Sequence, residues 1–294
     1  MIRLVKRKDL EIEKYDGCIA VSAQSRIYAF SWYLDIVAEN WDVLVLGDYE
    51  VVMPLPWKQK YFIKYITQPF FCQQLGVFSK ENLSEKLQEK MIQQIPKKFV
   101  KIALNFNSDN FLNSKMKPKR NYLLKIEKTY EENYKKFNNN RKRGLKKAEN
   151  SFLYIKEVEF DCLELIAYSN YSHLNYSHLD YEKLKKLIHV LKNKENGILL
   201  GVFNREKTII GGVLFLKDAH RLTYLFSVMN VEAKKINAAT FLLSRVIKQY
   251  ENQNLLLDFE GSMNIGISNF FKSFGGINEN YYQLKINAFK RIFF

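Results

Sequence analysis

The stretch Leu255-Leu256-Leu257-Asp258-Phe259-Glu260-Gly261-Ser262, followed by Phe270-Phe271-Lys272-Ser273-Phe274-Gly275-Gly276, decides the fold of this chain. The apolar run that ends in two alternating carboxylates and a glycine predicts a buried strand whose C-terminal end opens into a loop. The next segment, Asn264 to Phe274, has helical periodicity and stops at Gly275, a residue suited to a left-handed helix terminus. Chemistry in open α/β sheets tends to occur at such strand ends. The sequence therefore predicts a functional site beside this strand.

The two carboxylates of the strand are the candidate catalytic groups. Asp258 and Glu260 alternate and share one face, whereas Phe259 points the opposite way. Desolvation among aromatic side chains raises the proton affinity of a carboxylate, which suits it to accept a proton from an amine. Glu260 is the first candidate for this base. Asp258 is the second, with the alternative that it caps the following helix or pairs with a lysine.

Length and composition limit the class of protein. The 294 residues, 47% hydrophobic and 15% aromatic, are enough for one large or two ordinary domains. The N-terminus has no apolar leader and no apolar run approaches the length of a membrane span, so we expect a soluble cytoplasmic protein. The cysteines Cys18, Cys72 and Cys162 form no CxxC pair. We expect them to be buried apolar side chains.

Positive charge is concentrated in one segment. The formal net charge is +15, and the segment from Lys115 to Lys147 contains thirteen lysines and arginines but only three glutamates. Such a concentration favours a polyanionic partner: a phosphate-rich donor, RNA, an acidic carrier protein or an anionic lipid surface. The alternative is a lysine-rich solvated face.

The periodicity divides the chain near Ile126, into residues 1–126 and 127–294. The first part is a series of strands with a helix at Ala29–Glu39 and another at Asn82–Gln94. The second part opens with a basic helical segment, Tyr130–Asn150. It then follows the order strand, two helices, three strands, helix, strand, helix, strand. The ranges expected for that order are Phe152–Val158, Leu163–Tyr171, Tyr181–Lys192, Gly197–Phe203, Thr208–Leu216, Arg221–Met229, Ala233–Tyr250, Leu255–Phe259, Ile265–Phe274 and Tyr281–Asn287.

This order, together with the motif from Leu255 to Gly275, resembles the GNAT acyltransferase fold, in the branch of the Fem-type aminoacyltransferases. The resemblance implies an α/β (α+β) protein with two tandem GNAT-like domains, each a mixed central sheet flanked by helices. Several segments of the first part also resemble uncharacterised GNAT-like proteins common in Bacteroidetes. These segments are Trp32–Asp35, Trp41, Pro54–Lys58, Gln68–Pro69 and Gln73–Gly76.

The resemblance also implies a place for the donor. In GNAT folds the donor carbonyl lies against the strand that matches Arg221–Met229, so backbone groups near Phe226, Ser227 and Val228 would contact it. The loop that usually holds coenzyme A matches Glu232–Ala239, but its glycines are absent. Fem-type enzymes, which take aminoacyl-tRNA, also depart from this loop. The candidate donor contacts there are Lys234, Lys235 and Asn237, and the alternative for the two lysines is a solvated helical turn.

One position departs from the family pattern. Many GNAT enzymes have a tyrosine four residues before the glycine that corresponds to Gly275, where it protonates the leaving thiolate. Phe271 occupies that position and cannot donate a proton. Tyr281 and Tyr282 are candidate replacements by proximity in the sequence.

The basic helix Asn138–Glu149 resembles the arginine-rich segment that opens the second domain of Fem-type enzymes. Arg141, Lys142 and Arg143 are its candidate contacts to phosphate or RNA, because arginine suits bidentate phosphate contact and lysines attract an RNA backbone. The alternative is a solvated linker.

Candidate acceptor contacts occur in the first part. Trp57, Gln68, Gln73 and Gln74 fall in segments expected to be irregular and exposed, where they would line an acceptor pocket. His173 and His178 are five residues apart, about 140° around a helix, which is a poor spacing for a shared zinc ion. We expect no metal site.

The sequence thus predicts an N-acyltransferase that moves an acyl or aminoacyl group from acyl-CoA, acyl carrier protein or aminoacyl-tRNA to an amine by direct attack. The donor would be a co-substrate, with no tightly bound cofactor. The alternative is a noncatalytic binding module of degenerate GNAT fold that holds RNA or an acidic partner. Donor, acceptor and oligomeric state stay open.

Overall fold

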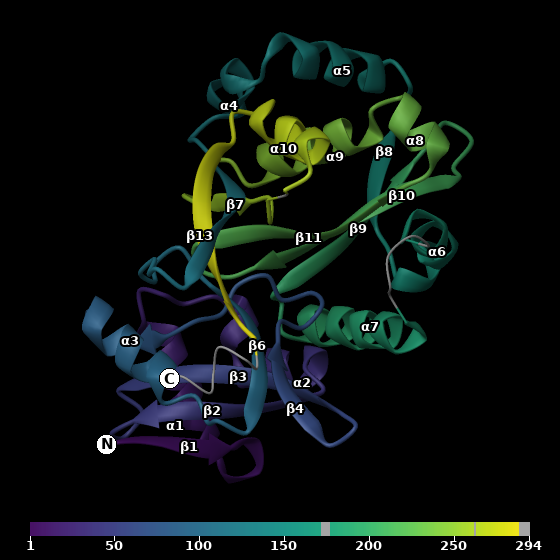
Figure 1. The fold of residues 1–294 in the computed structure, drawn as a ribbon. Coiled ribbons are helices and arrows are strands. Elements are labelled where there is room, and N and C mark those ends of the chain that lie inside the picture. Colours follow the sequence, from purple (N-terminus) through teal and green to yellow (C-terminus); the bar gives the residue numbers. More distant parts are fainter. Residues whose placement is uncertain (172–176, 262, 288–294) are drawn as a thin grey trace. The chain divides into compact units, whose positions relative to one another are not determined.

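A computed structural model describes residues 1–171, 177–261 and 263–287, with the side chain of residue 171 excluded (Figure 1). The chain forms two compact units. Unit 1 comprises Met1–Arg120 and the C-terminal segment from Asn280, and unit 2 comprises Asn121–Glu279. The sequence placed the boundary later, at Ile126, and assigned the last strand to the second domain. That strand belongs to unit 1 because its residues 282–286 pair with residues 102–106 of the same unit.

Unit 1 is built around a mixed sheet with the strand order β1-β2-β3-β4-β6-β13, and β5 pairs with β3. The β4–β6 pair is parallel, and the other pairs are antiparallel. Its elements are β1 (Ile2–Lys6), α1 (Ile12–Val21), α2 (Ser31–Val37), β2 (Asn40–Leu46), β3 (Val51–Lys60), β4 (Ile63–Thr67), β5 (Phe78–Ser79), α3 (Glu85–Gln93), β6 (Phe99–Phe106) and β13 (Ile277–Ile286, which starts before the boundary at Asn280).

Strand β3 continues through Pro54 and Pro56 to Lys60, and so includes Trp57, which was expected to lie in an irregular segment. One side of β3 pairs with β2 at residues 51–57, and the other side pairs with β5 at residues 51–52 and with β4 at residues 57–60. Both prolines fall in the interval between β5 and β4. A residue without a backbone N–H is tolerated where no ladder hydrogen bond is required.

From β8 to α10 unit 2 follows the predicted order of elements, except that one predicted helix is observed as two, α8 and α9. Its sheet has the order β7-β12-β11-β10-β9-β8, in which only the β11–β12 pair is parallel. Its elements are β7 (Met116–Lys125, which starts before the boundary), α4 (Tyr130–Lys136), α5 (Asn139–Glu149), β8 (Tyr154–Glu157), α6 (Glu164–Tyr171), α7 (His178–Asn193), β9 (Gly197–Phe203), β10 (Ile209–Lys217), β11 (Arg221–Met229), α8 (Val231–Lys235), α9 (Ala238–Gln249), β12 (Leu256–Asp258) and α10 (Ile265–Lys272).

Helix α9 forms the centre of the core of unit 2. It buries Phe241, Leu242, Val246 and Ile247, and α5 lies over it (Figure 1). The single helix expected over Ala233–Tyr250 is broken into α8 and α9 at Asn237, whose φ is 60°. Asparagine tolerates this left-handed conformation better than most residues. The break starts a new helix, α9, close to the end of β11.

None of the helices in the described part of the chain is both long enough and apolar enough to span a bilayer.

Candidate active site

The strands β11 and β12 pair over a short distance and leave a cavity beyond it. They are parallel from Arg221–Leu256 to Thr223–Asp258, after which β12 ends while β11 continues to Met229. A cavity of about 580 Å³ lies beyond this pairing, within unit 2. Its walls include Tyr224, Leu225 and Ser227 from β11, Glu260 from the turn after β12, and Phe270 and Phe271 from α10.

A β-bulge brings two consecutive residues of β11 to this cavity. Leu214 of β10 pairs with Phe226 and Phe215 pairs with Tyr224, so Leu225 is the extra residue. A bulge interrupts the alternation of side chains between the two faces of a sheet. Tyr224 and Leu225 therefore both line the cavity.

Tyr224 is a functional candidate that the sequence analysis missed. Its hydroxyl donates to Ser227 Oγ at 2.5 Å, and its ring packs edge-on against Phe271 at 6.0 Å. Burial raises the pKa of Tyr224 to about 12. The phenol therefore keeps its proton at neutral pH and can serve as a proton donor. By contrast, Tyr281 and Tyr282, the candidates chosen by proximity, belong to the part of the chain assigned to unit 1.

Asp258 lies in a buried network beneath the turn. Its Oδ2 is 2.9 Å from Arg221 Nη1, and its Oδ1 accepts from Asn121 Nδ2 and from the N–H of Glu260, both at 2.9 Å. Burial alone would lower the pKa of Arg221, but the carboxylates of Asp258 and Glu279 more than offset this and raise it. The expected lysine partner is thus an arginine. Asp258 fixes the turn and is not among the described residues that line the cavity.

Glu260 is at the position where the sequence predicted a base. It is half-buried, lines the cavity and has a φ of 49°. A non-glycine residue in this left-handed region is uncommon and is maintained by its surroundings. Here the hydrogen bond from its own N–H to Asp258 holds the conformation.

Helix α10 begins with a side-chain cap and supplies the aromatic wall. Asn264 Oδ1 accepts from the N–H groups of Gly266 and Ile267, which makes Asn264 the N-cap of the helix. Phe271 stacks on Phe259 with 4.7 Å between ring centroids. Phe271, at the position where many GNAT enzymes have a tyrosine, therefore packs against a second aromatic ring.

Only some of the predicted donor contacts have side chains at the cavity. Ser227 and Lys234 line the cavity, and Lys234 Nζ donates to Asn170 Oδ1 at 3.0 Å. The side chains of Phe226 and Val228 are buried outside the described lining, so any contribution from them comes from the backbone. The side chain of Lys235 is exposed. Asn237 packs against α5, because its Oδ1 lies 3.1 Å from the position that a Cβ on Gly144 would take.

Arg141 is buried behind the aromatic wall. Its Nε donates to Ser273 Oγ at 2.8 Å, and its Nη1 donates to Thr240 Oγ1 in the first turn of α9. The guanidinium lies 4.3 Å and 4.9 Å from the ring centroids of Phe270 and Phe274. Burial lowers the pKa of Arg141 to about 10, so the side chain stays charged at neutral pH. Both hydrogen-bond partners are neutral hydroxyls, so they do not neutralise the positive charge of Arg141. That charge lies close to the N-terminus of α9.

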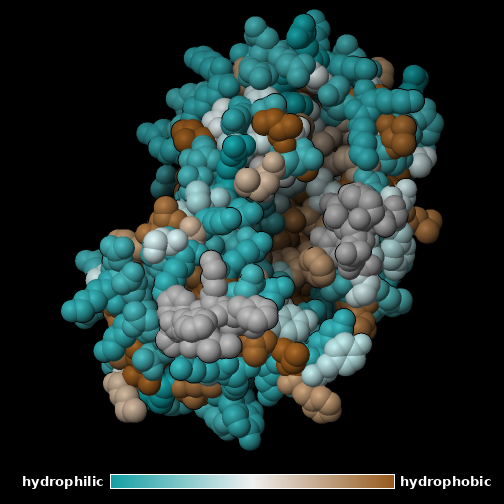
Figure 2. Space-filling model, viewed as in Figure 1, coloured by the Kyte–Doolittle hydropathy of each residue, from teal (hydrophilic) through white to brown (hydrophobic). Residues whose placement is uncertain are grey.

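The rest of the basic helix faces outward. Lys142 is half-buried, with its Nζ 5.2 Å from the ring centroid of Tyr134, whereas Arg143, Lys146 and Lys147 are exposed. Figure 2 shows a mainly hydrophilic surface over α4 and α5. Of the three predicted phosphate contacts, Arg143 is therefore the one open to solvent.

The predicted acceptor residues belong to unit 1 and are more ordered than expected. Trp57 is half-buried in β3, where its ring packs against Phe99 and lies 4.6 Å from Lys64 Nζ. It lines a cavity of about 380 Å³ with the ion pair Arg7–Asp35. The expectation that Trp57 falls in an irregular segment is wrong, because β3 extends beyond its prolines.

The three glutamines hold an irregular segment against β6. Gln68 accepts from the N–H of Asn105 at 3.0 Å and donates to the carbonyl of Cys72 at 2.7 Å. Gln74 is 1% exposed and donates to Gln73 Oε1. The expected exposure is wrong for Gln74, since this segment lies along a strand. His173, considered with His178 for zinc, lies outside the described residues.

Comparisons of the whole fold with solved structures give clear matches at low sequence identity. A structure of FemX aligns with a TM-score of 0.68 and 11% identity, over 95% of this chain and 96% of that one. A conserved protein of unknown function from Bacteroides thetaiotaomicron aligns with a TM-score of 0.61 and 10% identity, over 96% of this chain and 99% of that one. A tandem GNAT protein from the clavulanic acid biosynthesis pathway aligns with a TM-score of 0.54 and 10% identity, over 98% of this chain and 99% of that one. No family model matches the sequence, and no curated protein matches it.

The fold is therefore a mixed α/β fold that is similar to that of a tandem GNAT protein. It is also similar to the fold of FemX and to that of the Bacteroides thetaiotaomicron protein.

Proposed function

We propose that this protein is an N-acyltransferase that moves an acyl or aminoacyl group from an anionic donor to an amine. The observation that carries the proposal is the cavity beyond the β11–β12 pairing, which holds the carboxylate Glu260 and the protonated phenol Tyr224. General acid–base transfer to an amine needs one group of each kind. The fold shared with FemX and with a tandem GNAT protein supports the same class of reaction.

In this proposal the acceptor nitrogen attacks the donor carbonyl carbon directly. Glu260 accepts the proton that the nitrogen loses, and the bond between the carbonyl carbon and the leaving sulfur or oxygen breaks. Tyr224 gives its proton to that leaving atom. After the transfer Glu260 releases its proton to solvent and Tyr224 regains one from solvent. Backbone N–H groups of β11 near Ser227 would stabilise the oxyanion.

The positive charges near the cavity favour an anionic donor. Lys234 lines the cavity, and the buried guanidinium of Arg141 contacts the first turn of α9. Helix N-termini attract phosphate and carboxylate groups, and a nearby cation strengthens this attraction. Acyl-CoA, acyl carrier protein and aminoacyl-tRNA all carry phosphate in the part of the donor that bears the acyl or aminoacyl group. The altered loop at Glu232–Ala239 leaves all three as candidates.

The first experiment measures turnover with a panel of donors and amines, using mass spectrometry to detect the amide product. We expect Glu260→Gln to lower kcat at least about 100-fold, the usual contribution of a general base. Donor affinity should stay within about threefold, because the substitution preserves the shape of the side chain. The matched control is Glu131→Gln, which makes the same chemical change at an exposed position of α4.

The alternative function is a binding module that uses exposed α5 to hold RNA or an acidic partner. Phe271, which cannot donate a proton, favours it. In that case Glu260→Gln would leave binding unchanged and the wild-type protein would form no amide with any donor. That pair of results would overturn the acyltransferase proposal.

A further inference from the structure

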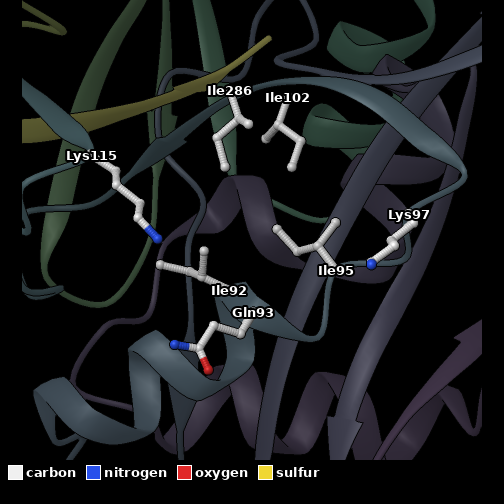
Figure 3. A pocket seen from close by; sticks show the side chains of 7 residues that line it. All are labelled: Ile92, Gln93, Ile95, Lys97, Ile102, Lys115 and Ile286. Carbon is white, nitrogen blue, oxygen red and sulfur yellow. The ribbon is translucent and has the colours of Figure 1, made fainter. Parts of the chain in front are cut away.

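The hairpin between β3 and β4 carries exposed apolar side chains at its tip, which consists of Tyr61, Phe62 and Ile63 (Figure 1). Tyr61 is 83% exposed, Phe62 95% and Ile63 53%. Buried isoleucines of the same unit instead line a cavity, as Figure 3 shows for Ile92, Ile102 and Ile286. Three consecutive exposed apolar side chains form a patch rather than an isolated residue, and such patches mark interaction sites.

The loop of this hairpin has a backbone conformation that its residues disfavour. The φ angle is 46° at Tyr61 and 65° at Phe62. A two-residue hairpin loop in which both φ angles are positive usually has Asn-Gly, Asp-Gly or Gly-Gly, because L side chains are strained in this region. Neither ring offsets the strain by packing into the core, since both are exposed. Strain that folding does not require is typical of functional segments.

Lysines surround the tip. Lys60 and Lys64 flank it within the hairpin, which has no acid from residue 57 to residue 67. Strand β6 runs parallel to β4 and begins opposite Lys64, so Lys97 and Lys98, which precede β6, lie at the same end of the sheet as the tip. Lys98 lies 3.7 Å from Asp42, whereas the other three form no ion pair with a carboxylate in the described part of the chain. The surroundings of the tip are therefore positively charged.

We propose that the tip of the β3–β4 hairpin inserts into the surface of an anionic lipid bilayer. Aromatic side chains partition into the interface of a bilayer, and lysines are attracted to anionic headgroups. An apolar contact and a basic patch together are the two signals that stable attachment to a membrane surface requires. A nucleic acid would match the lysines but offers no apolar phase for Ile63. The proposal is independent of the proposed transfer reaction, because it concerns unit 1 and requires no chemical step.

The test is co-sedimentation of the full chain with vesicles of phosphatidylcholine, alone or in an equimolar mixture with phosphatidylglycerol. We expect binding to the anionic vesicles to be at least about tenfold tighter, because each lysine near the surface adds to the attraction. The variant Phe62→Trp should also gain fluorescence that lipids with brominated acyl chains quench. Adsorption to the headgroups without insertion would not produce this quenching.

A change in the loop separates insertion from attraction by charge alone. The turn variant Tyr61→Asn/Phe62→Gly has the residues that this loop conformation favours, so it should unfold at no lower temperature than the wild type. Its binding to anionic vesicles should be at least about tenfold weaker, because the apolar contact is lost. The matched control is Phe152→Gly in unit 2, which removes an aromatic side chain that is 68% exposed and has a φ of 51°. This control should bind as the wild type does.

A second pair of variants tests the lysines. Lys60→Gln/Lys97→Gln should weaken binding to anionic vesicles at least about fivefold, since it removes two charges beside the tip. Lys86→Gln/Lys90→Gln removes the same charge from exposed positions of α3 and should have a smaller effect.

Four results would overturn the proposal: no preference for anionic vesicles, unchanged binding in the turn variant, an equal loss in Phe152→Gly, or equal losses in the two lysine variants. Unchanged binding in the turn variant would show that the net positive charge alone attracts the protein to lipid. Because the turn variant relieves backbone strain, loss of folding should not obscure the comparison.

Discussion

Asp258 shows how one buried side chain can serve a site that it does not enter. It joins Arg221, Asn121 and the N–H of Glu260 through three contacts of 2.9 Å. The side chains of Asp258 and Arg221 are 3% and 11% exposed. Their pairing fixes the turn that carries the proposed base.

Replacing Asp258 tests this positioning role. We expect Asp258→Asn to lower the free energy of unfolding by about 3 kcal/mol, because it leaves a buried guanidinium without its closest anion. Urea unfolding of the purified variant measures this. Asp161→Asn, at a side chain that is 78% exposed, should change stability by less than about 0.5 kcal/mol. A loss below about 1 kcal/mol for Asp258→Asn would contradict the role.

The raised pKa of Tyr224 predicts that the folded state loses stability at alkaline pH. Burial raises its pKa from 10.0 to about 12, so the folded state retains the proton where the unfolded state loses it. The stabilisation is therefore complete below about pH 10 and is lost as pH rises towards 12. Unfolding free energies measured from pH 9 to 11.5 should fall more steeply for the wild type than for Tyr224→Phe. Parallel curves would show that Tyr224 titrates normally.

Helix α10 is the element on which the aromatic wall of the cavity depends. Its N-cap is Asn264, which accepts from two backbone N–H groups. We expect Asn264→Ala to cost about 1 kcal/mol of stability and to weaken donor binding, since Phe270 and Phe271 belong to this short helix. Asn264→Ser, which keeps a capping oxygen, should restore most of both. Equal behaviour of the two variants in urea unfolding would exclude the cap as the cause.

The elements also show what a sequence can predict. Strands β9 and β11 have the predicted ends, because apolar residues fill them and polar residues bound them. The break at Asn237 was missed, since the apolar pattern continues from α8 into α9. A single left-handed residue leaves no periodic signal.

The site was predictable to the same limited extent. The sequence singled out Glu260, which lines the cavity, because a carboxylate at a strand end is visible in the sequence. Tyr224 was missed because the bulge at Leu225 interrupts the alternation of side chains between the two faces of the strand. That alternation is what predicts which face a side chain lies on. Arg141 was identified as a cation, but its burial depends on Phe270 and Phe274, which are far away in the chain.

At the scale of the whole molecule, the net charge of +15 predicts salt-dependent association with polyanions. Removing the exposed cations of α5 in Arg143→Ala/Lys146→Ala/Lys147→Ala should lower the slope of log affinity against log salt by about 2 for single-stranded RNA, if each cation neutralises one phosphate. Fluorescence anisotropy at several salt concentrations measures this. Lys80→Ala/Lys86→Ala/Lys90→Ala removes the same charge from unit 1 as a control. An equal change in both variants would show that total charge, rather than α5, governs binding.

The assignment of β13 to unit 1 has a consequence for biosynthesis. Residues 1–120 leave the ribosome first, yet β6 pairs on one side with residues 282–286. All of residues 121–279 must be translated before that partner emerges. During this interval the nascent N-terminal portion exposes a strand edge, the kind of surface on which chains aggregate and chaperones act. The pairing of β6 with β13 can therefore complete unit 1 only after unit 2 has been translated.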